Sequence, residues 1–298
     1  MVASVALTPA RVWWSAVRPA TLAASVSPVL AGTAIAVHDG AARPAAGLAA
    51  LLVGVAMQLG VNFANDYSDF RRGADTPARI GPVRAASSGV VAPTHVMMAA
   101  IGSFGLAGAI GFGLALATDW RLLLVGAACI VAGGLYTGGP RPYGYLGLGE
   151  LFVFLFFGLV ATCGTVYVEE LHITPLSVLI GSSMGFLASA ILVLNNLRDI
   201  GTDAAAGKRT LATRIGRRRT LYLLLMLVCA AFAMPIIAFA MHLAAVTTML
   251  ALVAVPIAAV SVRTAFATTA GPALVGALKR MAVAELAFAL LLTVGLLV

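Results

Sequence analysis

Two short polar segments hold five of the eleven acidic residues in this 298-residue chain. Within each segment, an asparagine is followed by carboxylates at intervals of three or four residues. Such spacing places side chains on one face of a helix, because a helix turns once in about 3.6 residues. The residues that define the two faces are Asn62, Asp66 and Asp69 in the first segment and Asn195, Asp199 and Asp203 in the second.

Carboxylates crowded on one helix face repel each other unless a cation lies between them. Neither segment contains His or Cys, so the available ligands are hard oxygen atoms, which favour Mg²⁺. Magnesium accepts few protein ligands and shares its coordination shell with substrate phosphates, while neighbouring Lys and Arg bind the remaining phosphate oxygens. The two faces therefore predict a magnesium-dependent clamp for a diphosphate. The predicted metal ligands are Asp66, Asp69, Asp199 and Asp203, with Asp75 as a further candidate.

The two segments are related by a single offset in the sequence. Asn62 and Asn195 are 133 residues apart, and so are Asp66 and Asp199. This predicts an internal duplication, with units at about 18–140 and about 147–262 and a final helix at 279–298. The alternative is a pair of solvated loops in which Asp and Arg form surface ion pairs. Such pairs contribute little and need no regular spacing, so two matching faces favour a functional site.

The elements that carry these segments are expected to be membrane helices. Hydrophobic residues make up 61% of the chain and charged residues only 10%, whereas a soluble domain has about a quarter charged residues. Crossing a bilayer takes about 20 apolar residues, and the alternation typical of a membrane barrel is missing. Residues 1–298 are thus predicted to form one polytopic all-α domain, a bundle of nine transmembrane helices. The spans are expected at 18–38, 45–66, 94–117, 120–137, 147–168, 174–197, 219–241, 243–262 and 279–298.

The basic residues indicate how this bundle is oriented. Seventeen of the nineteen Lys and Arg residues lie in the N-terminal segment or in loops on its side, and only Arg43 and Arg121 lie on the other. By the positive-inside rule, the N-terminus and both Asp-rich segments are cytoplasmic, in a bacterial inner (cell) membrane. The net charge of +8 is then explained by orientation signals and phosphate ligands, without a nucleic-acid partner.

At these residues the sequence resembles the UbiA superfamily of intramembrane prenyltransferases. The motifs Asn65-Asp66-x-x-Asp69 and Asp199-x-x-x-Asp203 match the superfamily pattern in order, spacing and location. Many members have a third Asp four residues after the first motif, where this chain has Gly73. The resemblance implies a nine-helix bundle around a central cavity that binds a polyprenyl diphosphate with Mg²⁺. The residues it implies for diphosphate binding are Asn62, Asn65, Arg72, Arg79, Arg84, Asn195, Lys208 and Arg209.

Three further stretches resemble the superfamily members that prenylate 1,4-dihydroxy-2-naphthoate in menaquinone biosynthesis. They are Arg79–Arg84 with the following Ser88-Gly89, Tyr136–Glu150 and Gly207–Gly216. The resemblance implies attack of the allyl cation on the carboxylated ring carbon, with loss of CO₂ and a proton to give demethylmenaquinone. It also implies a set of residues around the aromatic acceptor, which are Tyr136, Arg141, Tyr143 and Glu150.

Two alternatives remain at this point. A sibling enzyme could prenylate 4-hydroxybenzoate, haem or a chlorophyll precursor, and a cation transporter could use membrane carboxylates for conduction. A transporter would place its charges near the middle of the bilayer, whereas the two Asp faces lie at helix ends beside Lys and Arg. Glu285 is a carboxylate within the last predicted span, and its role is left open. Prenyl chain length and oligomeric state do not follow from the sequence.

Overall fold

A computed structural model of the protein describes residues 7–73 and 81–298. These residues form helices joined by short turns, without any β-strand among them. Asp75 and Arg79 lie outside the described residues. The elements are α1 (Pro9–Val17), α2 (Pro19–His38), α3 (Pro44–Arg71), α4 (Pro93–Ala117), α5 (Leu122–Leu135), η1 (Tyr143–Leu146), α6 (Gly149–Val153), η2 (Phe154–Val160), α7 (Ala161–Glu170), α8 (Pro175–Ala205), α9 (Leu211–Ala240), η3 (Val246–Ala254), α10 (Val255–Ala267) and α11 (Gly271–Leu297).

The all-helical membrane architecture is confirmed, but the count of nine spans is not. Among the described residues, eight helical segments are long and apolar enough to cross a membrane. The segment predicted at 120–137 is α5, which has 14 residues and is shorter than the roughly 20 that a perpendicular crossing requires. Two of the eight are composite, because α6, η2 and α7 form one continuous span and η3 with α10 forms another.

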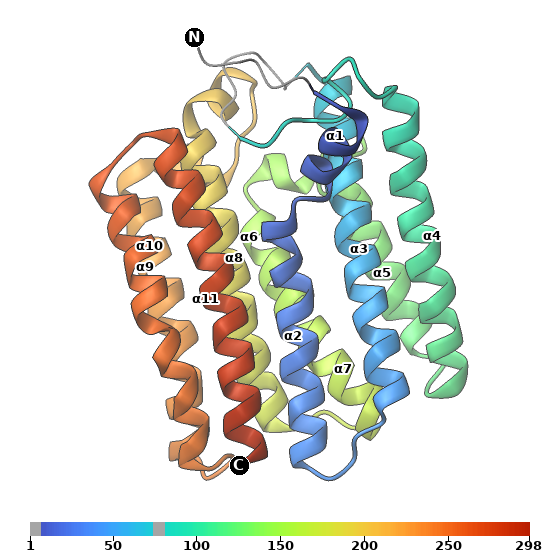
Figure 1. The fold of residues 1–298 in the computed structure, drawn as a ribbon, viewed down its shortest axis with the longest axis vertical. Helices are drawn as coiled ribbons and strands as arrows, with labels where there is room; N and C mark the ends of the chain where they lie inside the picture. The colour runs from blue at the N-terminus through green and yellow to red at the C-terminus, as the bar shows by residue number, and fades with distance from the viewer. Residues whose placement is uncertain (1–6, 74–80) are drawn as a thin grey trace.

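The helices that carry the Asp motifs continue well past their apolar residues. Helix α3 runs on to Arg71 and α8 to Ala205, so both motifs occupy final helical turns and not loops. Each helix is followed by a glycine at positive φ, Gly73 at 64° and Gly207 at 72°. This left-handed conformation is the usual way to end a helix, because glycine has no Cβ to clash there. The C-terminal ends of α3 and α8 reach the same end of the bundle as α1 (Figure 1).

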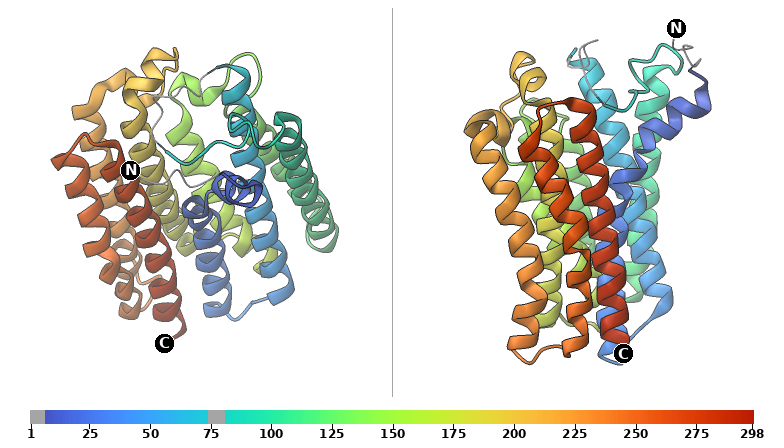
Figure 2. Two further views of the ribbon diagram at one scale, coloured as in Figure 1. Left: turned by 45° about the horizontal axis from the view of Figure 1, so that its top comes forward. Right: turned by 60° about the vertical axis from the view of Figure 1, so that its left-hand side comes forward.

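Helix α8 lies at the centre of the bundle and α4 at its edge. Of the candidate spans, α8 is the most buried and α4 the least. The main apolar core joins α8 to α2, α9, α10 and α11. Figures 1 and 2 show how these helices are arranged in the bundle. A smaller core joins α1 and α3 to the residues around Ala85, which follow the undescribed segment. The predicted internal duplication stays a prediction, since the structure by itself does not test common ancestry of the two halves.

Close backbone contact fixes the span that begins at Gly149 against α8. A Cβ added at Gly158 would lie 2.4 Å from the Cα of Gly185, so both positions require glycine for this approach. The contact coincides with η2, a π-helical stretch that ends at Val160. Such π-turns are often found at functional sites. Here the stretch sets the position of α6, and therefore of Glu150, against the polar end of α8.

Candidate active site

The two Asp-bearing helix ends meet around one small polar cavity of about 60 Å³. Helices α3 and α8 supply all three of its acidic groups, and the segments before α6 and after α8 also line it. The lining residues are Arg18, Asn65, Asp69, Arg84, Tyr136, Thr137, Gly144, Tyr145, Asn195, Asn196, Asp199, Thr202, Asp203, Lys208 and Thr210. The structure therefore brings together the two segments that the sequence predicted to form a clamp.

Asp69 is the most heavily bonded carboxylate of the cavity. Its oxygens accept hydrogen bonds from the Arg84 guanidinium at 2.7 Å, from Lys208 Nζ at 2.8 Å and from the Tyr145 hydroxyl at 2.9 Å. Asp69 is 2% exposed, so these bonds form in a low-dielectric setting where each is stronger than at the surface. Two cations and a phenol thus converge on one carboxylate.

Asp66, by contrast, does not line the cavity. It is fully buried, and its two oxygens accept the backbone N–H groups of Ala85 at 2.9 Å and Ala86 at 3.1 Å. Asn65 and Asp69, four residues apart, both line the cavity, whereas the Asp66 carboxylate bonds to the Ala85–Ala86 backbone instead. Asp66 holds the segment that carries Arg84, and this arrangement places Arg84 over Asp69.

Asn62 also lies away from the cavity. Its amide donates to the Val17 carbonyl at 2.9 Å and to Thr21 Oγ1 at 3.2 Å, and its side-chain oxygen accepts from Gln58 at 3.1 Å. These bonds tie α3 to the junction of α1 and α2. The predicted face of Asn62, Asp66 and Asp69 is therefore divided in the structure between helix packing and the cavity.

On α8 the predicted residues do face the cavity. Asp199 forms a two-pronged ion pair with its neighbour Arg198, whose guanidinium also donates to the Asn195 side-chain oxygen at 2.9 Å. Asp203, one turn further, is half-buried in the cavity wall. Asp199 and Asp203 thus share one face of α8, as their spacing predicted.

The end of α8 explains why Lys208 reaches Asp69. The Lys208 N–H donates to the Asp203 carbonyl at 2.8 Å, and the Gly207 N–H donates to the Ala204 carbonyl at 3.1 Å. This pair of bonds around a left-handed glycine is a Schellman motif, which reverses the chain direction. The reversal turns the Lys208 side chain back over the cavity. The Gly207-Lys208 motif of the sequence therefore positions the lysine side chain at the cavity.

Tyr145 is a site residue that sequence reasoning did not single out. Its hydroxyl bonds to Asp69, and its ring lies 4.9 Å from Lys208 Nζ and 5.4 Å from the Arg72 guanidinium carbon. Burial raises the pKa of Tyr145, and the Asp69 charge raises it further, so the phenol stays protonated and donates. The only sequence signal for it was its place within the Tyr136–Glu150 stretch.

The other basic residues predicted to bind the diphosphate or the acceptor lie further from the centre of the cavity. Arg72 donates to the Gly139 carbonyl, and its guanidinium carbon lies 5.4 Å from the centre of the Tyr145 ring. Arg209 and Arg141 are exposed and do not line the cavity, and the Arg209 backbone N–H donates to the Tyr145 carbonyl at 3.1 Å. Arg79 lies outside the described residues, so its predicted phosphate contact stays a prediction.

The predicted acceptor residues form an aromatic wall next to the cavity. Tyr136 lines the cavity and lies 5.5 Å from the Tyr143 ring, which in turn stacks on Phe152 at 4.0 Å. Glu150 is buried behind this wall and accepts the Asn196 amide at 2.9 Å. Since Asn196 lines the cavity, Glu150 contacts the cavity through Asn196.

The donor set suits a hard divalent cation that also binds phosphate. Asn65, Asp69, Asp199 and Asp203 present only oxygen ligands to one cavity. Over the described ranges, no three His, Cys, Asp or Glu side chains are close enough to chelate a metal unaided. Mg²⁺ takes few protein ligands and completes its shell with substrate phosphates. The residues present therefore fit a magnesium-diphosphate site.

Fold and site together define a helical membrane protein with an acidic and basic cavity at one end of the bundle. The chain belongs to the UbiA prenyltransferase family, whose model matches residues 25–273. It is 48% identical to the 1,4-dihydroxy-2-naphthoate octaprenyltransferase of Mycobacterium tuberculosis over 70% of this chain and 71% of that protein. It is 38% identical to the enzyme of the same name from Escherichia coli, over 74% of this chain and 75% of that one.

Solved structures agree with this fold. A UbiA homolog from Archaeoglobus fulgidus aligns with a TM-score of 0.64 at 16% identity, covering 96% of this chain and 99% of that chain. A structure of a UbiA homolog from the same organism, bound to DMAPP and Mg²⁺, aligns with a TM-score of 0.62 at 15% identity, covering 95% and 99%. At such identities the likeness shows the fold alone.

Proposed function

We propose that this protein transfers a polyprenyl group from polyprenyl diphosphate to 1,4-dihydroxy-2-naphthoate. The bond between the allylic carbon and the diphosphate oxygen breaks, and a bond forms to the carboxylated ring carbon. CO₂ and a proton leave the ring, and the products are diphosphate and the prenylated hydroquinone demethylmenaquinol, the reduced form of demethylmenaquinone. Relatives from M. tuberculosis, M. leprae and E. coli that bear this activity in their names support the acceptor. The proposed prenyl donor, a diphosphate ester, is supported by one observation. Four charged side chains converge on one cavity, namely Asp69, Arg84, Lys208 and Asp199.

The diphosphate end of the donor binds by an exchange of partners. The charged side chains that line this cavity already pair with one another, so a diphosphate that enters it displaces some of those contacts. Lys208 and Arg84 leave Asp69 and turn to the phosphate oxygens, where charge-assisted hydrogen bonds form. Asn65, Asp69, Asp199 and Asp203 would hold Mg²⁺, which neutralises charge on the leaving diphosphate. The Archaeoglobus homolog bound to DMAPP and Mg²⁺ supports this pairing of metal and diphosphate.

Several residues act by holding the binding groups in position. Asp66 anchors the Ala85–Ala86 backbone and so fixes Arg84. Tyr145 holds Asp69 through its hydroxyl and supports Lys208 with its ring. Arg198 orients Asp199 by a two-pronged ion pair. This division separates positioning residues from the groups that contact the substrate.

The naphthoate ring binds against the wall formed by Tyr136 and Tyr143. Aromatic side chains offer stacking surface to a planar acceptor, and the Asn196 amide can bond to its oxygens. Glu150 fixes Asn196 from behind, since its carboxylate accepts the amide at 2.9 Å. The apolar wall also keeps water from the allyl cation, which would otherwise be lost to hydrolysis.

The site faces the cytoplasm in this proposal. In the sequence, seventeen of the nineteen Lys and Arg residues lie in segments predicted to share the side of the two Asp motifs, and the positive-inside rule assigns that side to the cytoplasm. Labelling of single cysteines introduced at Arg209 and at Asp39 tests this orientation in sealed, right-side-out vesicles. An impermeant thiol reagent should modify the Asp39 position and not the Arg209 position. The free cysteines of the chain are first replaced by alanine.

A competition assay tests the proposed reaction. The purified protein is incubated with Mg²⁺, a polyprenyl diphosphate and equal amounts of 1,4-dihydroxy-2-naphthoate and 4-hydroxybenzoate. Mass spectrometry should detect a prenylated naphthalene product that has lost CO₂, and chelation of Mg²⁺ should abolish it. Exclusive prenylation of 4-hydroxybenzoate would refute the acceptor, and turnover that survives chelation would refute the metal requirement.

A further inference from the structure

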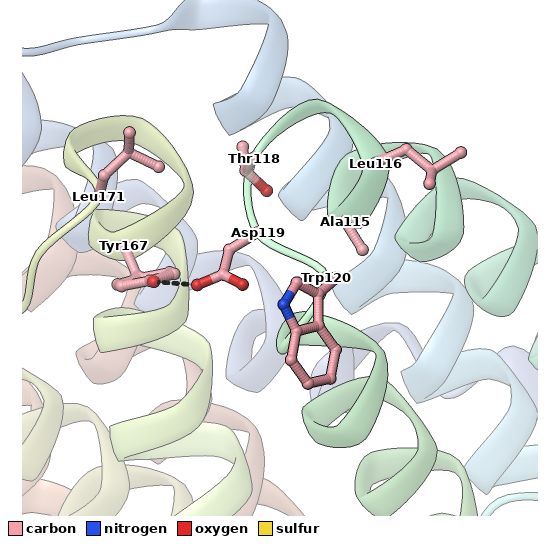
Figure 3. A pocket seen from close by; sticks show the side chains of 7 residues that line it. All are labelled: Ala115, Leu116, Thr118, Asp119, Trp120, Tyr167 and Leu171. Atoms are coloured by element: carbon pink, nitrogen blue, oxygen red, sulfur yellow. Dashed lines mark hydrogen bonds between the residues drawn. The ribbon is translucent and has the colours of Figure 1, made fainter.

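A second and larger pocket lies at the end of the bundle opposite the polar cavity. It has a volume of about 420 Å³ and lies between the turn that joins α4 to α5 and the C-terminal end of α7 (Figure 3). Its walls combine three polar and several apolar side chains. The lining residues include Leu116, Thr118, Asp119, Trp120, Tyr167 and Leu171. None of its lining residues belongs to the proposed active site.

Asp119 is held as an anion within this pocket. The Tyr167 hydroxyl donates to its Oδ2 at 2.5 Å, and the Arg121 backbone N–H donates to its Oδ1 at 2.9 Å. The bond from Tyr167, followed by the one from Arg121, lowers the pKa of Asp119. Figure 3 shows the carboxylate between Tyr167 and Trp120, with the indole on the opposite side from the phenol. Each carboxylate oxygen keeps a lone pair for a further donor.

This end of the bundle is acidic, unlike the end with the active site. In the described part of the chain, it holds four carboxylates against two guanidiniums. The carboxylates are Asp39, Asp119, Glu169 and Glu170, and the guanidiniums are Arg43 and Arg121. Glu169 is used within the fold, because it accepts Thr33 Oγ1 at 2.7 Å and the Arg43 backbone N–H at 3.1 Å. A ligand with a positive group is therefore favoured here over an anionic one.

The pocket also adjoins an exposed apolar surface of the helical bundle. Leu116 is 70% exposed and Trp120 64%, and α4 is the least buried candidate span of the described chain. Trp side chains are enriched at the level of lipid headgroups, where the indole contacts both apolar and polar groups. A molecule that occupies this pocket can thus place apolar chains along α4 and α5 while its polar group reaches Asp119.

We propose that this pocket binds a phospholipid with a primary-ammonium headgroup, of the phosphatidylethanolamine type. The ammonium donates to the free lone pairs of Asp119 and lies against the Trp120 indole, which attracts cations through its ring face. Arg121, which follows Trp120 in the chain and is exposed, offers a guanidinium to the phosphate of the same headgroup. The acyl chains lie along α4 and α5. An anionic headgroup without an ammonium would bring its charge against Asp119.

Native mass spectrometry of the detergent-purified protein tests this lipid preference. The probes are phosphatidylethanolamine and phosphatidylglycerol with identical acyl chains, added at equal concentration. The wild type should retain the ethanolamine lipid preferentially, and Asp119→Asn should reduce that retention roughly fivefold. Asp39→Asn is the matched control, because it removes a carboxylate from the same end without touching the pocket, and it should retain the lipid as the wild type does.

A second measurement keeps the test decisive if Asp119→Asn fails to fold. Phenylalanine replaces Trp13 and Trp14, which leaves Trp120 as the sole tryptophan, and quenching by brominated lipids is measured in vesicles. Brominated ethanolamine lipid should quench Trp120 more than brominated glycerol lipid, and Tyr167→Phe should reduce the difference. Prenyl transfer should be unchanged in Asp119→Asn and Tyr167→Phe. Equal retention or equal quenching by the two lipids overturns the proposal, as does an unchanged preference in both variants.

Discussion

Replacing Tyr145 with phenylalanine removes one hydroxyl from the centre of the proposed site and leaves the ring in place. That hydroxyl is one of three donors to Asp69, at 2.9 Å, and its partner is a buried carboxylate. A hydrogen bond to a charged group contributes about 1.5–3 kcal/mol. The ring keeps its contacts with Lys208 and Arg72, so the change isolates the bond to Asp69. Because Tyr145 is only partly buried, we expect its hydrogen bond to contribute the lower of these two energies.

A loss of about 1.4 kcal/mol corresponds to a tenfold change in rate or affinity, so kcat/KM for the polyprenyl diphosphate should fall about tenfold. The Mg²⁺ concentration that gives half-maximal activity should also rise, because Asp69 would be less well oriented toward the metal. A purely structural role of Tyr145 would leave that midpoint unchanged. Tyr222→Phe, at an exposed tyrosine on α9, is the control and should behave as the wild type. Unchanged kcat/KM and an unchanged Mg²⁺ midpoint in Tyr145→Phe would refute the reasoning.

Three further substitutions give distinct outcomes. Asp66→Asn should lower the melting temperature and weaken substrate binding. One carboxylate oxygen that accepts a backbone N–H becomes an amide donor, at a cost of about 1–3 kcal/mol. Thermal denaturation measures the first effect and KM the second. Glu285→Met should raise the melting temperature. Glu285 is fully buried, and neither of its carboxylate oxygens is hydrogen-bonded within the described chain. An apolar side chain of similar size removes the cost of burying this unpaired polar group, roughly 1–3 kcal/mol. Gly158→Ala should destabilise the protein by about 1–3 kcal/mol and reduce activity through displacement of α6, whereas Gly164→Ala, with open space at its Cβ, should do neither.

The sequence predicted which segments meet but not how each helix is rotated. Spacing of three and four residues identified a face on α3, yet two overlapping faces satisfy the same pattern. Asn65 and Asp69 point to the cavity, while Asn62 and Asp66 point to α1, α2 and the Ala85 backbone. The choice between them depends on where the neighbouring helices lie, which is a tertiary property. On α8 the predicted face was the one that the cavity uses.

Contacts between distant parts of the chain were also beyond local reasoning. Tyr145 reaches Asp69 across 76 residues and Lys208 reaches it across 139. Apolar length predicted where the helices begin, but α3 and α8 continue until Gly73 and Gly207 allow the chain to turn. The apolar criterion likewise gave α5 a longer span than its 14 residues provide. The sequence therefore predicted which motifs form the site. It did not predict which residues each side chain contacts.

The central claim is that the ends of α3 and α8 form one binding site for magnesium and a diphosphate. A double-mutant cycle with Asp69→Asn and Asp199→Asn tests it most directly, with binding of an unreactive polyprenyl thiodiphosphate measured by calorimetry in the presence of Mg²⁺. Residues that act as one unit give non-additive effects. Each single variant should weaken Mg²⁺-dependent binding strongly but measurably, and the double variant should bind about as weakly as either. Additive losses, or near-normal binding in both single variants, would contradict a shared site.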